Sequence, residues 1–196
     1  MVQKKSNQDK WLKIGLIAVG VIILISLLIS PYNKLVGLDE EVQQSWSDVQ
    51  VQYQRRADLI PNLVETVKGY ASQEQTVLTE VTEARSAWAS AQASGDQASQ
   101  IAAAQSMDGA LSRLLVTVEA YPDLKSNQNF IALQDELAGT ENRVSVARTR
   151  YNEAVATYNK MVRQFPSNIY AGMLGFDRKE SFQANSGSQN APQVEF

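Results

Sequence analysis

The sequence predicts an all-α protein in which an N-terminal transmembrane helix is followed by an antiparallel up-and-down bundle of long helices. Three observations support this fold class. An apolar run fills residues 11–29, apolar residues recur every three or four positions over most of the remaining chain, and no stretch alternates as a strand does. Glycine and proline fall mainly between the periodic segments, where they separate helices. We expect four bundle helices, or three if the chain only kinks at Pro61.

The predicted anchor occupies residues 11–30, after a basic segment at 1–10. Its apolar part, WLKIGLIAVGVIILISLLI, contains one charge, Lys13, near the end where a lysine can reach the headgroups. At a rise of ~1.5 Å per residue, about 20 residues cross a hydrocarbon core of ~30 Å. A cleaved signal peptide is the alternative, but the apolar run exceeds a usual signal peptide and Pro31 follows the candidate cleavage residue Ser30. We therefore predict an uncleaved anchor.

Charges on the two sides of the anchor predict its orientation in the cytoplasmic membrane. The N-terminal side carries the four lysines Lys4, Lys5, Lys10 and Lys13 and a single acid, Asp9. On the other side, Lys34 is followed by Asp39, Glu40 and Glu41. Because basic flanks stay in the cytoplasm, we expect a cytoplasmic N-terminus and an extracytoplasmic bundle. The rest of the chain has 14 basic and 20 acidic residues, which argues against binding to nucleic acid and to anionic lipid.

The helical bundle is predicted over residues 31–165. Apolar spacings of three and four continue from 35 to 88 and cross Pro61, where the helix must kink or a new helix must begin after Asp58. The first clear turn is SAQASGDQASQ, with Gly95 in its middle. A shorter helix over 101–121 ends at Pro122, and a helix of about ten turns follows over 130–165.

Two short segments complete the predicted organisation. Residues 166–182 contain the apolar stretch NIYAGMLGF, which either caps the bundle end or lies at the membrane interface, where Tyr170 and Phe176 suit the headgroup layer. Residues 183–196 form a tail rich in Ser, Gln, Asn and Gly that is too polar to order itself, although Val194 and Phe196 could dock.

The residue inventory argues against catalysis. The chain has no histidine and no cysteine, which removes thiolate nucleophiles, disulfides, the usual zinc ligands and the commonest general base. Four carboxylates could be proposed for metal or acid–base chemistry: Asp39, Glu40, Glu41 and Glu65. Without histidine or a second carboxylate cluster we interpret them as charges on helix surfaces. We expect no catalytic residue, no cofactor and no metal.

The candidate partner-binding site is the densest polar cluster beside an apolar one. Arg55, Arg56 and Asp58 precede the run LIPNLV, which contains Asn62. Paired arginines with an acid could bind a carboxylate or a partner chain. The alternative is a solvated helix face with a local ion pair next to a kink.

Aromatic residues on the periodic stripes are interpreted as core. Tyr151 and Tyr158 lie seven residues apart, so they share one helix face, and tyrosines at this spacing are usually packed with a hydrogen-bonded hydroxyl. Trp46 and Trp88 also lie on apolar stripes and are expected to anchor the core.

Several motifs of this chain resemble the LemA family. They are Tyr32-Asn-Lys-Leu-Val, Val42, Trp46, QRRADLIPNLVETVKGYA at 54–71, Glu80-Val-Thr-Glu-Ala-Arg, Tyr121-Pro-Asp-Leu-Lys, Arg150-Tyr-Asn-Glu-Ala-Val, Phe165-Pro and Val194-Glu-Phe. The resemblance covers nearly the whole chain. It implies a bacterial membrane protein with an N-terminal anchor and an up-and-down bundle, and it carries over no catalytic residue. The family commonly has a histidine shortly after the Gly-Tyr-Ala stretch, where this chain has Gln73.

The resemblance also implies a class of function. Members look like accessory proteins of membrane-stress and membrane-protease systems, and relatives take part in magnetosome membrane biogenesis. We expect a non-enzymatic, membrane-tethered scaffold that forms homo-oligomers in the cell envelope, because a helix of about ten turns beside a shorter one leaves apolar surface uncovered. The alternative is an adaptor module that presents residues 55–62 to a membrane protease or another envelope partner.

Overall fold

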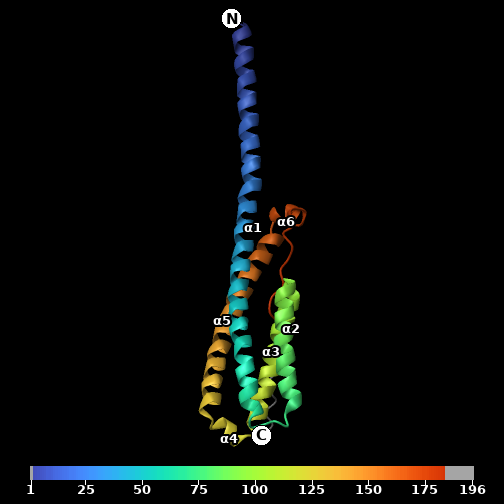
Figure 1. Cartoon of the computed structure of the whole chain (residues 1–196). Coiled ribbons are helices and arrows are strands. Elements are labelled where there is room, and N and C mark those ends of the chain that lie inside the picture. Colours follow the sequence, from blue (N-terminus) through green and yellow to red (C-terminus); the bar gives the residue numbers. More distant parts are fainter. Residues whose placement is uncertain (1, 184–196) are drawn as a thin grey trace, which may run out of the picture. The chain divides into compact units, whose positions relative to one another are not determined.

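The computed structural model describes residues 2–183, except for the side chains at 2–13, 21, 23–25, 27, 28 and 170. Its elements are α1 (Val2–Lys68), α2 (Gln75–Ser94), α3 (Gln97–Val118), α4 (Pro122–Lys125), α5 (Gln128–Arg163), α6 (Ser167–Tyr170) and the 3-10 helix η1 (Gly172–Leu174) (Figure 1). No strand occurs within residues 2–183, which confirms the all-α prediction. Of the predicted tail at 183–196, residues 184–196 lie outside the described part.

The chain divides into two compact units. Unit 1 consists of residues 1–43 and 154–179, and unit 2 consists of residues 44–153 and 180–196. Helices α1 and α5 contribute to both units, so each unit is considered by itself. The predicted bundle range of 31–165 is therefore shared between them.

Unit 2 is a four-helix bundle with antiparallel neighbours. Trp46 of α1 packs on Tyr151 of α5, whereas Arg55 pairs with Glu136 earlier in α5, so these helices run in opposite directions. Helices α2 and α3 lie side by side as a hairpin (Figure 1), joined across their surfaces by the pair of Arg113 and Glu80 at 2.8 Å. The number of helices in this unit is the predicted four, but the boundary that gives the fourth helix lies at residues 69–74 and not at Pro61.

The core of unit 2 is built from the apolar stripes that predicted its helices. Trp88 is buried to 1% exposure and Trp46 to 8%, which confirms both as core anchors. Fully or nearly fully buried neighbours from the four helices include Val49, Tyr53, Ile60, Leu63, Val67, Val81, Met107, Leu114, Phe130, Val144 and Tyr151. Burial of such a continuous set is what holds the four helices together.

Pro61 lies inside α1, which continues to Lys68. Proline has no N–H to give the carbonyl four residues earlier. That carbonyl, of Ala57, instead accepts a hydrogen bond from Arg85 Nε of α2 at 3.1 Å. The side chain of a neighbouring helix thus replaces the missing backbone donor, and the alternative that a new helix begins after Asp58 is wrong.

The first interhelical turn lies at residues 69–74, earlier than predicted. Gly69 follows the last residue of α1, and Ala71 N–H donates to Val67 O at 2.8 Å to close the helix end. The periodic pattern conceals this turn because Ala71 is itself buried at 1% exposure. A glycine directly after Lys68 is the signal that could have located it.

The next connections have ordinary capping chemistry. Gly95 has φ 71° and ends α2, a left-handed conformation that favours glycine. Asp96 accepts from Ser99 N–H at 2.9 Å and caps α3. Asn127 accepts from Phe130 N–H at 3.1 Å before α5. The turn predicted around Gly95 is confirmed.

Unit 1 combines parts of α1 and α5 with α6 and η1. Its buried residues include Leu35, Val42, Val155, Tyr158 and Ala171. Lys179 closes the unit, because its ammonium pairs with Asp39 at 2.9 Å and its backbone forms two hydrogen bonds with the Asn159 side chain, each 2.9 Å long.

Among the side chains that the structure describes, no helix has a stretch long and apolar enough to cross a membrane. The predicted anchor at 11–30 falls partly outside that described set, as do the side chains of the basic segment at 1–10.

Candidate functional site

The four candidate residues occupy different environments on α1 in unit 2. Arg55, Asp58 and Asn62 are exposed, whereas Arg56 is only 1% exposed. Consecutive residues of a helix point about 100° apart, so Arg55 can face solvent while Arg56 faces the interior of the bundle. The structure therefore does not bring Arg55 and Arg56 together on one surface.

Arg55 and Asp58 line a shallow surface groove. Arg55 forms hydrogen bonds of 3.0 and 2.5 Å to Glu136, and Asp58 accepts from Gln54 at 2.7 Å. The groove has a volume of about 420 Å³ and is lined by Ser47, Gln50, Val51, Gln54, Arg55, Asp58 and Gln92. Val51 is 61% exposed and supplies its apolar wall. Asn62 is exposed outside this groove.

Arg56 belongs instead to a partly buried ion network, in which its own side chain is 2% exposed and that of Glu141 is 65% exposed. It donates to Asp108 of α3 and to Glu141 of α5. Arg148 of α5 donates to Asp108 and to the hydroxyl of Tyr53. The Tyr53 hydroxyl in turn donates to Asp108 at 3.0 Å. These five residues, hereafter the ion network, connect α1, α3 and α5 inside unit 2.

Burial shapes the electrostatics of the ion network. It raises the pKa of Asp108 to about 7, against the opposing effect of the Arg56 charge and with a further rise from Glu141. It lowers the pKa of Arg148 to about 10. The Nε atoms of Arg56 and Arg148 are buried and have no hydrogen-bond partner among the described residues. Removing one member of a buried ion pair leaves the other charge uncompensated, which is strongly destabilising.

Sequence reasoning missed Asp108, Glu141 and Arg148. A weak signal existed for Asp108, which follows Ala104 by four residues on the core-facing stripe of α3. A charge at such a position requires a buried partner. The partners of Arg56 lie 52 and 85 residues away in the sequence, so no local pattern identifies them.

Phe182 occupies an aromatic pocket on unit 2. Its ring lies 5.9 Å from that of Trp46, 6.5 Å from Tyr53 and 5.9 Å from Tyr151. The Arg148 guanidinium lies 4.7 Å from the ring centre, a cation–π arrangement. The pocket thus shares Tyr53 and Arg148 with the ion network.

Hydrogen bonds fix the backbone around Phe182. Asn152 donates to Phe182 O at 3.1 Å and accepts from Phe182 N–H at 3.0 Å. Tyr151 donates to Glu180 O at 2.6 Å, and burial raises the pKa of Tyr151 to about 12. These contacts confirm Tyr151 as a packed tyrosine with a bonded hydroxyl. Tyr158, in unit 1, is likewise buried.

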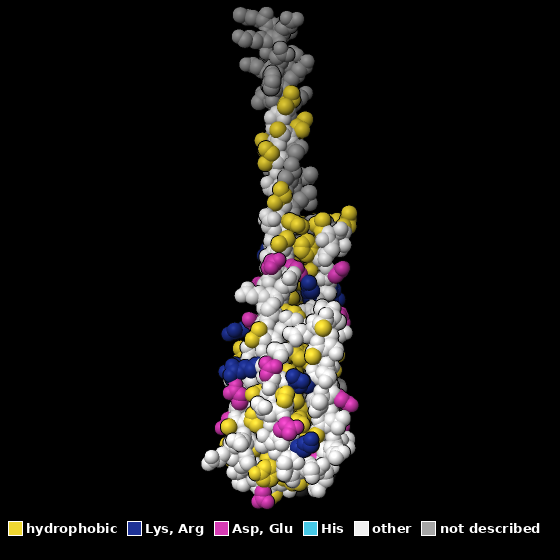
Figure 2. Space-filling model, viewed as in Figure 1, with side chains coloured by type: hydrophobic (Ala, Val, Ile, Leu, Met, Phe, Trp, Pro, Cys, Tyr) yellow, Lys and Arg dark blue, Asp and Glu magenta, His cyan; other side chains and the backbone are white. Residues whose placement is uncertain are grey.

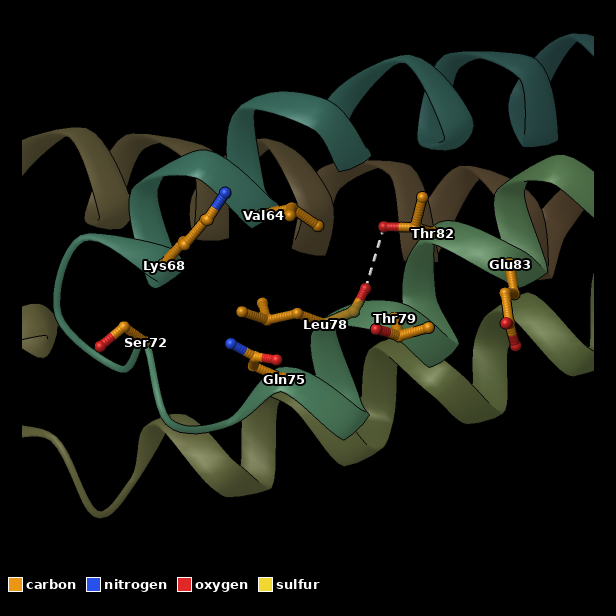
Figure 3. A pocket seen from close by; sticks show the side chains of 8 residues that line it. All are labelled: Val64, Lys68, Ser72, Gln75, Leu78, Thr79, Thr82 and Glu83. Carbon is orange, nitrogen blue, oxygen red and sulfur yellow. Dashed lines mark hydrogen bonds between the residues drawn. The ribbon is translucent and has the colours of Figure 1, made fainter.

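A second groove, of about 400 Å³, lies between the end of α1 and the start of α2 (Figure 3). Val64 and Leu78 supply its apolar surface, and Thr82 donates to the carbonyl of Leu78 at 2.9 Å. No group of three or more metal-binding side chains occurs in the described part of the chain.

Comparison with known proteins decides the family. The model of the LemA family matches residues 45–196, which is most of the chain and contains the whole ion network. The chain belongs to the LemA family. The resemblance seen in the motifs is thereby confirmed, and the LemA match also takes in the Phe182 pocket.

Curated relatives of this LemA-family chain include magnetosome proteins. Magnetosome protein MamQ 2 of Paramagnetospirillum magneticum is 28% identical over 187 residues, covering 84% of this chain and 69% of the relative. Magnetosome protein MamQ of Magnetospirillum gryphiswaldense is 26% identical over 194 residues, covering 87% and 71%. Protein LemA of Metamycoplasma hominis is 24% identical over 153 residues, covering 78% and 69%.

Proposed function

We propose that this LemA-family chain is a non-enzymatic scaffold that residues 11–30 tether to the cytoplasmic membrane and that self-associates in the bacterial cell envelope. One observation supports the proposal that residues 11–30 are a membrane tether. Between residues 14 and 29 of α1, the large apolar side chains that the structure describes are all more than half exposed, namely Ile14, Leu16, Ile17, Val19, Ile22 and Ile29. They point around the whole helix circumference, as in a helix surrounded by lipid. The names of the magnetosome relatives agree with a role on a bacterial organelle.

Unequal helix lengths support self-association. Helix α5 has 36 residues, whereas α2 has 20 and α3 has 22. The end of α5 and residues 31–43 of α1 therefore belong to a unit that contains neither α2 nor α3. Two helices bury only one face each, which leaves faces available to further copies. A tether that confines copies to one membrane raises their effective concentration.

Topology is the first test of this proposal. Single cysteines replace Ser6 and Ser186 in this cysteine-free chain, and intact cells are labelled with a membrane-impermeant maleimide. Labelling at Ser186→Cys alone supports an extracytoplasmic bundle. Labelling at Ser6→Cys alone reverses the orientation, and release of the chain from membranes by alkaline carbonate contradicts the tether.

Light scattering tests self-association of the detergent-solubilised full chain, with detergent mass subtracted. We expect a mass of several copies that persists on dilution. A strict monomer at high concentration contradicts the scaffold proposal.

The second candidate function is an adaptor that binds a membrane protease or another envelope partner through the groove beside Arg55. It is favoured by Val51, an exposed apolar residue next to an arginine and an acid. A photoreactive residue at Val51 should crosslink to such a partner in cells, and Arg55→Ala with Asp58→Ala should abolish the crosslink at unchanged helical content. Arg56 is unsuited to this test because it is buried in the ion network.

A further inference from the structure

We propose that residues 165–176, hereafter the apolar cap, insert into the interfacial layer of the bilayer that holds the anchor. The inference rests on the proposed tether. Four large side chains of this segment are exposed: Phe165 at 80%, Ile169 at 63%, Met173 at 86% and Leu174 at 52%. Residues 164–176 include no charged residue. Figure 2 shows hydrophobic side chains gathered over this part of unit 1.

The orientation of the cap residues is the reverse of that expected for a turn that covers a protein core. Its small residues Ser167 and Ala171 are buried at 0% and 1% exposure, whereas the four large side chains just named point outward. An exposed apolar cluster of this kind requires a partner outside the chain. Of the two alternatives for this segment, a bundle cap and an interfacial segment, the burial pattern favours the second.

Contact with α1 places the cap at the depth of the headgroups. The ring of Phe176 lies 5.8 Å from that of Tyr32, edge to face. Tyr32 is two residues beyond the predicted end of the anchor, about 3 Å along the helix axis. The interfacial layer extends for ~5–8 Å beyond the hydrocarbon on each side. The cap therefore lies within it when the anchor spans the bilayer.

The polar part of unit 1 lies farther from the membrane. Asp39, which pairs with Lys179, is nine residues beyond the end of the anchor, about 14 Å along the axis and past the interfacial layer. Along α1, the apolar contact of Tyr32 with Phe176 thus comes nearer the anchor than the ion pair of Asp39 with Lys179. This is the order expected beside a membrane surface. Continuity with the exposed apolar side chains of α1 identifies lipid as the partner, in preference to a protein.

Depth measurements on the full chain in phosphatidylcholine vesicles test the cap. Single cysteines at Ile22, Met173 and Val116 each carry an environment-sensitive fluorophore, and iodide quenching reports water access. Val116 is a matched control, being apolar and 68% exposed on α3. We expect several-fold weaker quenching at Ile22→Cys and Met173→Cys than at Val116→Cys.

The outcomes separate this inference from the tether. Quenching at Met173→Cys equal to that at Val116→Cys, with Ile22→Cys still protected, overturns the cap contact and leaves the tether standing. Strong quenching at Ile22→Cys overturns the tether itself. Protection of Met173→Cys in native membranes but not in lipid vesicles assigns the cap to a protein and also overturns the inference.

A second variant removes the apolar contact without disturbing buried residues. Ile169→Ser together with Phe165→Ser should increase iodide quenching of a label at Met173→Cys while the chain stays with the vesicles. Unchanged quenching means that these side chains do not hold the cap in the interface.

Discussion

In unit 2, Arg56 is 1% exposed, whereas in unit 1 Met173 is 86% exposed, which inverts the usual positions of a charged and an apolar residue. The two inversions are resolved differently. Arg56 has carboxylate partners on two other helices of the same unit. The outward-pointing side chains of the apolar cap are left uncovered within unit 1. The first inversion therefore concerns how the chain folds, and the second concerns what it contacts.

The same distinction separates the two arginines of the candidate site. The two residues are adjacent in sequence, but the Arg56 side chain lies in the interior of unit 2 and the Arg55 side chain lies on its surface. A variant that removes both would confuse loss of a partner with loss of the fold. The following predictions test whether the buried features are structural and the exposed ones are not.

The largest effect is expected from Asp108→Ala. At pH 8 this change leaves Arg56 and Arg148 buried without their shared carboxylate, which should lower the free energy of unfolding by about 3–5 kcal/mol. Urea denaturation of the full chain in detergent, followed by circular dichroism, measures it. Asp58→Ala is the matched control, because its carboxylate is exposed and accepts a hydrogen bond from Gln54 within the same helix. Equal stability of the two variants would show that the network contributes nothing.

Phe182→Ala should have the next largest effect. It empties the aromatic pocket, and a buried phenylalanine typically contributes about 3 kcal/mol or more to the free energy of unfolding. Phe165→Ala is the comparison, since Phe165 is 80% exposed and its removal should change stability by less than about 0.5 kcal/mol. A similar loss in both variants would contradict the assignment of Phe182 to the core and Phe165 to the surface.

Arg85→Met tests the replacement of the donor that Pro61 lacks. Loss of the bond to Ala57 O leaves a buried carbonyl unsatisfied, which should cost about 1–3 kcal/mol. Pro61→Ala restores a backbone N–H to that carbonyl, so the same arginine substitution should then cost much less. Thermal unfolding of the two single variants and the double variant gives the coupling. Additive effects would mean that Arg85 acts through other contacts.

The pKa of Asp108 predicts a smaller, pH-dependent effect. The folded chain holds its proton up to about pH 7, whereas an unfolded aspartate releases it near its ordinary 3.8. Between these values the folded state binds about one proton more, so the free energy of unfolding falls by about 1.4 kcal/mol per pH unit as pH rises. Asp108→Asn removes this titration. Wild type should therefore lose stability relative to the variant from pH 4.5 to 6.5, and a relative gain would contradict the raised pKa.

Much of the fold follows from local sequence patterns, whereas the ion network does not. Apolar spacing and Gly95 locate helices because they act within a few residues. The turn at 69–74 escapes the pattern, since buried Ala71 preserves the apolar spacing across it. The position of Arg56 depends on Asp108 and Glu141, which only tertiary packing brings near. Local patterns therefore identify a polar cluster at 55–58 but cannot separate its buried arginine from its exposed one.

The smallest effect on stability is expected from Arg55→Ala. Its pair with Glu136 is exposed on both sides, 51% and 39%, and such pairs contribute about 0–1 kcal/mol. Thermal unfolding should therefore barely change, in contrast to Arg56→Ala, which unpairs two acids in and beside the core. If Arg55→Ala alone abolishes crosslinking from Val51, the loss is one of recognition, because the fold is intact. If Arg55→Ala destabilises the bundle as strongly as Arg56→Ala does, Arg55 is structural too. The groove beside Arg55 is then no longer supported as a partner-binding surface.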